Sequence, residues 1–68
     1  MSNDTIITAE AAVQLADRGH ASIAESIRYA AVRGEDTASL TADLAAAEIV
    51  LVVAQAAARD ARAAAVGE

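Results

Sequence analysis

The side chains that could do chemistry are few in this 68-residue sequence. His20 is the only histidine, and the sequence contains no cysteine. Zinc in proteins is usually held by several His and Cys ligands, so one copy of this chain cannot supply such a set. Without cysteine no disulfide can form either. We therefore predict neither a metal site nor a cofactor.

Nucleophilic and acid–base catalysis also lack the necessary groupings. Ser22, Ser26 and Ser39 have no companion base in a recognisable arrangement. The acidic residues are scattered or lie near the expected helix ends. No two carboxylates are therefore paired in a way that suits acid–base catalysis. No glycine-rich phosphate loop is present. The sequence therefore predicts a protein that is not an enzyme.

Glu48 and Gln55 are the polar residues within the most apolar stretch, residues 44–58. They are two helical turns apart, so they share one side of a helix. Buried polar residues of this kind fix the register of helical assemblies or contact a partner. A solvated polar line on an otherwise apolar helix gives the same pattern, and we slightly favour that interpretation.

The elements that must position these residues are two long helices. Alanine occupies 21 positions and proline none, which favours helix throughout. Thr8 is a suitable N-cap for a first helix over 9–33, and Gly34 a suitable stop. A turn over 34–37 leads to a second helix over 38–66. Because the connection is short, we expect an antiparallel hairpin within a single domain, 1–68.

Both expected helices carry an apolar seam with steps of three and four residues, as in coiled coils. The first seam comprises Ile6, Ala9, Val13, Ala16, His20, Ile23, Ile27 and Ala30. The second comprises Leu40, Leu44, Ala47, Leu51, Ala54, Ala58, Ala61 and Ala65. The many alanines predict a close approach of the helices.

His20 falls on the first seam. It could meet its symmetry mate in a dimer and act as a pH switch. We favour a partly buried histidine with one hydrogen-bond partner, for which Asp17 is the candidate.

The second helix is also apolar away from its seam, so one neighbouring helix cannot cover it. This further face consists of Ala42, Ala46, Ile49, Val50, Val53 and Ala57. We predict an all-α homodimer in which two hairpins form a four-helix bundle. The expected oligomer interface comprises Val13, His20, Ile23, Ile27, Leu40, Leu44, Ile49, Val50, Leu51 and Val53.

Gly19 leaves two alternatives for the first helix. Ser22 and Glu25 match a capping box, so the chain could stop near Arg18 and restart at Ser22. The unbroken seam through His20 favours one continuous helix, with at most a kink, since glycine costs only about 1 kcal/mol in a helix.

The spacing of Ser22, Glu25, Ile27–Arg28 and Ala30 after Gly19 resembles that of the ribbon–helix–helix family of DNA-binding regulators and antitoxins. This resemblance covers residues 4–33. It implies a strand at 4–8, a turn at Gly19 and a C-terminal helix that binds a partner such as a toxin. The family reads DNA with polar or basic side chains on its strand, whereas residues 4–8 contain no basic residue.

The net charge of −5 disfavours partners held through phosphates, whether nucleic acid or an anionic membrane. Residues 44–58 are too few to span a bilayer. No basic region followed by an apolar run marks a secretory signal, so we expect a cytoplasmic protein. We predict a self-associating interaction or assembly module, with itself and another protein as partners. A ribbon–helix–helix regulator is the alternative, and an accessory chain of an enzyme is a third.

Overall fold

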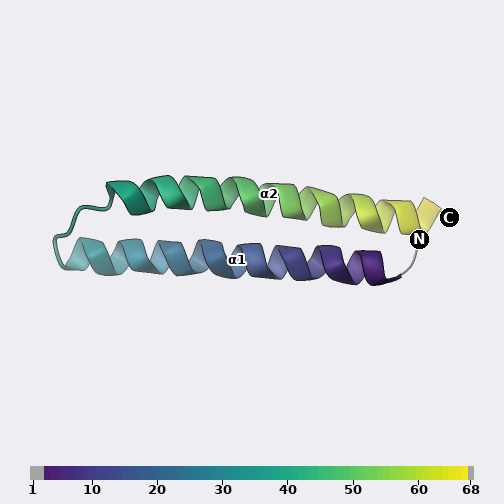
Figure 1. The fold of residues 1–68 in the computed structure, drawn as a ribbon, viewed down its shortest axis with the longest axis horizontal. Helices are drawn as coiled ribbons and strands as arrows, with labels where there is room; N and C mark the ends of the chain where they lie inside the picture. The colour runs from purple at the N-terminus through teal and green to yellow at the C-terminus, as the bar shows by residue number, and fades with distance from the viewer. Residues whose placement is uncertain (1–2, 68) are drawn as a thin grey trace.

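The computed structural model describes residues 3–67, which form two antiparallel helices joined by a short loop (Figure 1). Helix α1 spans Asn3–Val32 and helix α2 spans Ala38–Gly67. The backbone measures 54 × 14 × 11 Å, so the molecule is a rod. The beginning of α1 and the end of α2 lie at the same end of the rod, opposite the loop. The expected all-α antiparallel hairpin is confirmed.

Helix α1 begins at Asn3, six residues before the predicted start, so the expected N-cap at Thr8 is wrong. Asp4 lies in the first turn, where a carboxylate interacts favourably with the helix dipole. Ile6 is half-buried and continues the apolar seam before Ala9. Packing against α2 therefore extends the helix beyond its local capping signal, as tertiary contacts commonly do.

Helix α1 continues through Gly19 without interruption. An added Cβ at Gly19 would meet no atom within 4 Å, so the glycine is not required by a close contact. Within residues 3–32 the backbone is helical throughout, and this segment contains neither the strand at 4–8 nor the turn at Gly19 that the ribbon–helix–helix resemblance implies.

Hydrogen bonds close the loop at both helix ends. Gly34 has a φ of 75°, the left-handed conformation that glycine adopts without steric cost. The Gly34 and Glu35 amides donate to the Ala31 and Ala30 carbonyls at 3.1 and 2.9 Å, which is a Schellman motif. At the start of α2, the Ala38 amide donates to Asp36 Oδ1 at 3.0 Å. The loop thus turns the chain with both helix ends satisfied.

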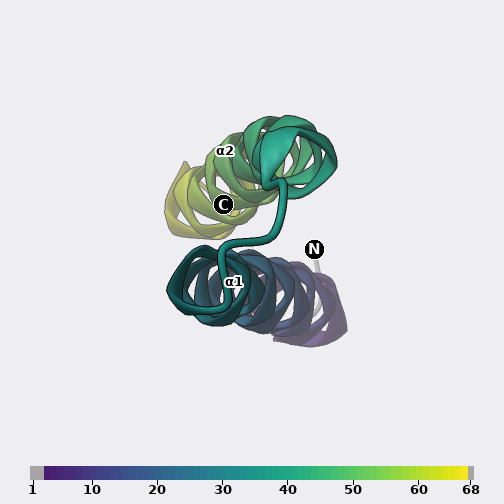
Figure 2. The ribbon, with the colours of Figure 1, turned by 90° about the vertical axis from the view of Figure 1, so that its left-hand side faces the viewer.

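The contact between α1 and α2 is the pair of predicted seams. Every seam position named from the sequence is half-buried or buried, and the two helices lie side by side and cross gradually along the rod (Figure 2). The buried residues are Ala30, Ala58 and Ala61, with exposed fractions of 4, 2 and 8%. Small side chains bring the two backbones together, so the hairpin core is thin.

Candidate functional site

The predicted interface residues separate into two groups in the structure. Seven are half-buried in the seam between α1 and α2: Val13, His20, Ile23, Ile27, Leu40, Leu44 and Leu51. The other three, Ile49, Val50 and Val53, are exposed. The first group therefore holds the hairpin together, and the second group lies on a surface that the chain does not cover.

His20 contacts α2 rather than Asp17, the partner expected from the sequence. Its Nε2 atom lies 3.6 Å from Glu48 Oε1, across the seam. Nε2 itself is buried and has no hydrogen-bond partner. The Glu48 side chain is 66% exposed, against 27% for His20. The arrangement makes an ion pair when His20 is protonated, and leaves a buried, unsatisfied nitrogen when it is neutral.

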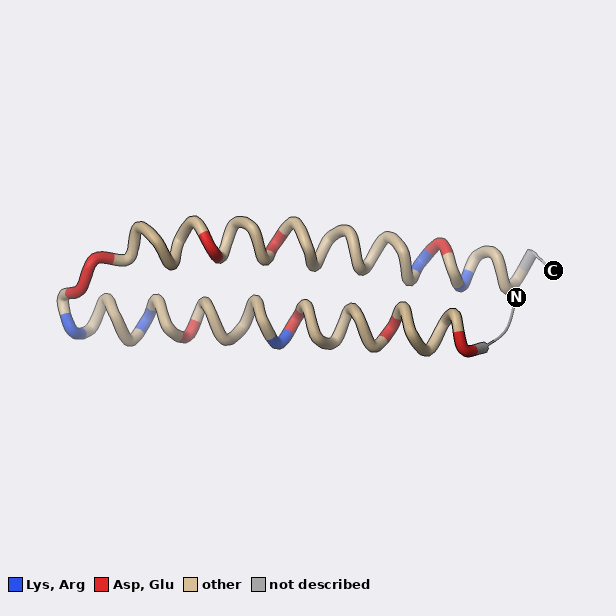
Figure 3. The backbone as a smooth tube through the Cα atoms, in the orientation of Figure 1, with Lys and Arg blue, Asp and Glu red and all other residues tan. Residues whose placement is uncertain are grey.

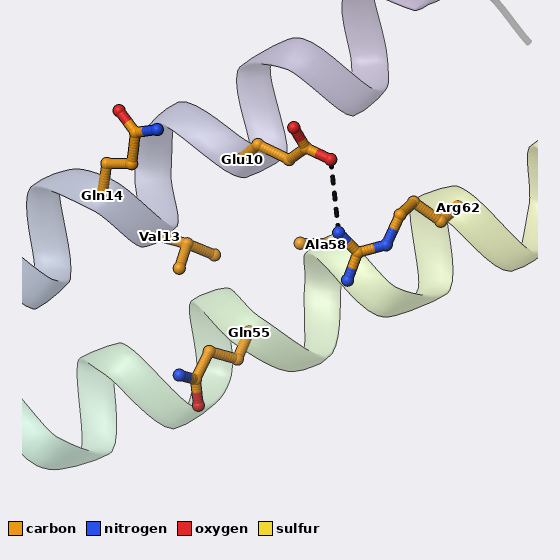
Figure 4. A pocket seen from close by; sticks show the side chains of 6 residues that line it. All are labelled: Glu10, Val13, Gln14, Gln55, Ala58 and Arg62. Carbon is orange, nitrogen blue, oxygen red and sulfur yellow. Dashed lines mark hydrogen bonds and ion pairs between the residues drawn. The ribbon is translucent and has the colours of Figure 1, made fainter.

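One side of the hairpin carries polar groups from both helices (Figure 4). Glu10 and Gln14 of α1, with Gln55 and Arg62 of α2, line a hollow of about 430 Å³. Glu10 and Arg62 point toward each other, whereas the Gln14 and Gln55 side chains point away from the opposite helix. Arg62 Nη1 donates to Glu10 Oε1 at 3.2 Å. Sequence reasoning did not find this pair. Gln55 thus belongs to an open polar surface rather than to a buried register contact.

The opposite side carries small residues. A hollow of about 500 Å³ lies there, lined by Asp4, Thr5, Thr8, Ala9, Ala12, Ala57 and Ala61. Most of these side chains end in a methyl or a hydroxyl group. Such residues allow another helix to approach closely.

The further apolar face of α2 is fully open. We call it the outer strip, defined by Ala42, Ala46, Ile49, Val50, Val53 and Ala57, all of which are exposed. Exposed fractions are 66% for Ile49, 58% for Val50 and 62% for Val53. The tube in Figure 3 shows no charged residue between Glu48 and Arg59 of α2. An exposed contiguous apolar surface marks a site of association.

No family model, curated protein or solved structure matches this chain. Within residues 3–67, no group of three or more His, Cys, Asp and Glu side chains could hold a metal ion. The function must therefore be inferred from the surface, and the outer strip is its most distinctive feature.

Helix α2 is longer than the apolar stretch considered from the sequence. By length and composition alone, Ala38–Val66 could cross a membrane, and none of its most apolar window is buried in the hairpin. A helix that is covered on two sides in a helical bundle is also long and apolar on most of its circumference. The absence of a membrane partner and the cytoplasmic location stay predictions.

Proposed function

We propose that this protein is a non-enzymatic assembly module, a helical hairpin that associates with itself through α2. The observation that carries the proposal is the exposed outer strip, centred on Ile49, Val50 and Val53. In the hairpin, α2 is covered by α1 along its seam only. A second hairpin on the outer strip gives the four-helix bundle, in which α2 has apolar neighbours on two sides.

The size of the strip supports a real but moderate affinity. Removing Ile49, Val50 and Val53 of two copies from water contributes roughly 7 kcal/mol, given about 2 kcal/mol for full burial of each side chain and their present exposure. Association itself costs about 4–15 kcal/mol in lost freedom of motion. The surrounding alanines must therefore add contact area, and we expect dissociation constants in the micromolar range.

The polar side chains of α1 and α2 make ordinary surface contacts. The Ser26 hydroxyl donates to the Ser22 carbonyl at 3.1 Å, an ordinary contact within a helix. Glu10 and Arg62 neutralise each other on the polar side.

Sedimentation equilibrium of the purified chain at micromolar concentration tests the proposal. We expect a dimer or a larger assembly whose population rises with concentration. A well-folded monomer over the whole range would contradict self-association. We expect no binding to double-stranded DNA at physiological salt, because residues 4–8 offer no basic side chain to the phosphates. A DNA mobility shift caused by the protein would contradict the proposal and favour a DNA-binding regulator.

A further inference from the structure

One polar side chain lies in the seam, whose other positions carry alanine or larger apolar residues. His20 is half-buried on α1, and its Nε2 atom is buried without a hydrogen-bond partner. Histidine is the side-chain type that ordinarily gains a proton between pH 8 and pH 5. The sequence holds one histidine and no cysteine. Mild acidification therefore adds charge to the seam rather than to the other side chains.

The charged groups that face His20 are acidic on both helices. From α2, Glu48 Oε1 lies 3.6 Å from Nε2. On α1, Asp17 precedes His20 by three residues, and residues at this spacing are neighbours on a helix surface. One turn to either side of Glu48, positions 44, 45, 51 and 52 carry only leucine, alanine or valine. A proton on His20 therefore meets negative charge from two directions and no positive charge from this part of α2.

We propose that protonation of His20 stabilises the hairpin through an ion pair with Glu48 across the seam, so that the fold is a pH-sensitive element. The pair joins the middle of α1 to the middle of α2. Both residues belong to one chain, so the effect is independent of the self-association proposed above.

The sign of the effect follows from what each form of the imidazole meets. A neutral ring gains no hydrogen bond at Nε2, because the Glu48 oxygen lies too far away for one. A protonated ring gains an opposite charge nearby, and attraction between charges falls off only gradually with distance. The unfolded chain offers no such fixed partner. Protonation therefore stabilises the hairpin relative to the unfolded chain, and this gain is present at low pH and lost as pH rises.

The size of the effect is limited by exposure. The Glu48 side chain is mostly exposed, so water and salt weaken its attraction for the imidazolium. Ion pairs of this kind change an equilibrium constant about two- to fivefold. We expect the unfolding equilibrium constant to fall by this factor between pH 8 and pH 5.5.

Urea unfolding at pH 5.5 and pH 8, followed by far-UV circular dichroism, tests the inference. Glu48→Gln removes the facing charge at an exposed position, and His20→Leu removes the group that binds the proton. Glu10→Gln is the matched control, because it removes the carboxylate of the other pair that joins the helices, whose partner Arg62 stays charged throughout. Each protein is measured at two concentrations tenfold apart.

The natural chain should gain the two- to fivefold stabilisation at pH 5.5, equally at both concentrations. E48Q should match the natural chain at pH 8 and lack the gain at pH 5.5. H20L should be equally stable at both pH values. E10Q should keep the full gain between the two pH values, whatever its own stability.

Three results would overturn the inference. Equal stability of the natural chain at pH 5.5 and pH 8 would show that the proton does not act on folding. A full gain retained in E48Q would show that Glu48 is not the partner, and its loss in Asp17→Asn would then assign that role to Asp17. A gain that grows with protein concentration would place the effect between copies, and would leave the proposed self-association intact.

Discussion

The seam and the outer strip are both apolar surfaces of α2, but the chain covers only one of them. Leu44 and Leu51 on the seam are half-buried against α1, whereas Ile49 and Val53 on the strip are more than half exposed. A hairpin cannot enclose both sides of a helix. The difference teaches that α2 has more apolar surface than its own chain covers. The seam holds the hairpin together, and the strip is the surface on which we propose association.

The largest effect is expected from a charge on the seam. Leu51→Asp places a carboxylate between the helices without a partner, at a cost of about 4 kcal/mol or more, which exceeds what a hairpin this small can tolerate. We expect loss of helicity by circular dichroism at all protein concentrations. A fully helical Leu51→Asp variant would show that the seam does not hold the hairpin.

A charge on the strip should act on association instead. Val53→Asp should leave the isolated hairpin folded, because the side chain is exposed in it. It should raise the dissociation constant at least about a hundredfold, corresponding to about 3 kcal/mol, since the carboxylate is desolvated in the assembly. Sedimentation equilibrium measures this change.

Ser22→Asp is the matched control, at an exposed position of α1. It should leave the assembly unchanged. Equal loss of association in both variants would show that the effect comes from added negative charge and not from the strip.

A smaller effect is expected at the polar position of the seam. His20→Leu replaces a buried nitrogen that has no hydrogen bond with an apolar group, so it should stabilise the hairpin by about 1 kcal/mol at neutral pH. Urea unfolding measures the gain. Glu48→Gln, which keeps the size of the exposed partner, should change stability little. Destabilisation by His20→Leu would show that the histidine makes an essential contact.

Substitutions at Gly19 and Gly34 should give changes of opposite sign, similar in size to the change expected at His20. Gly19→Ala should stabilise α1 by up to about 1 kcal/mol, because the position is helical and the added Cβ meets nothing. Gly34→Ala should destabilise by about 1–2 kcal/mol, since its φ of 75° is unfavourable for other residues. Thermal unfolding of the two variants compares them directly. A loss of stability in Gly19→Ala would show that this part of α1 approaches another chain closely.

The hairpin and its seams could be predicted because they depend on local signals. Periodic apolar residues, Gly34 and the short loop determine which faces meet. The early start of α1 could not be predicted from capping, because packing of Ile6 against α2 extends the helix past Thr8. Local hydrogen bonding favoured the wrong boundary, and tertiary contact overrode it.

The polar contacts were less accessible to sequence reasoning. In an antiparallel hairpin, residues equally far from the loop face each other, and this rule would have brought Glu10 near Arg62. The same rule brings His20 near Glu48, whereas attention to neighbours in sequence favoured Asp17. No such rule predicts what covers the strip, because the described part of the chain leaves it exposed.

The start of α1 and the end of α2 lie at the same end of the rod, and this placement has a mechanical consequence. A force applied to the two ends of the helices would peel them apart one turn at a time, rather than shear the whole seam at once. Peeling would begin where Ala58, Ala61 and Ala65 supply the contacts, which are the smallest in the seam. It would meet more resistance on reaching Leu51, Leu44 and Ile27. The hairpin should therefore yield to low force at its open end while its loop half stays closed.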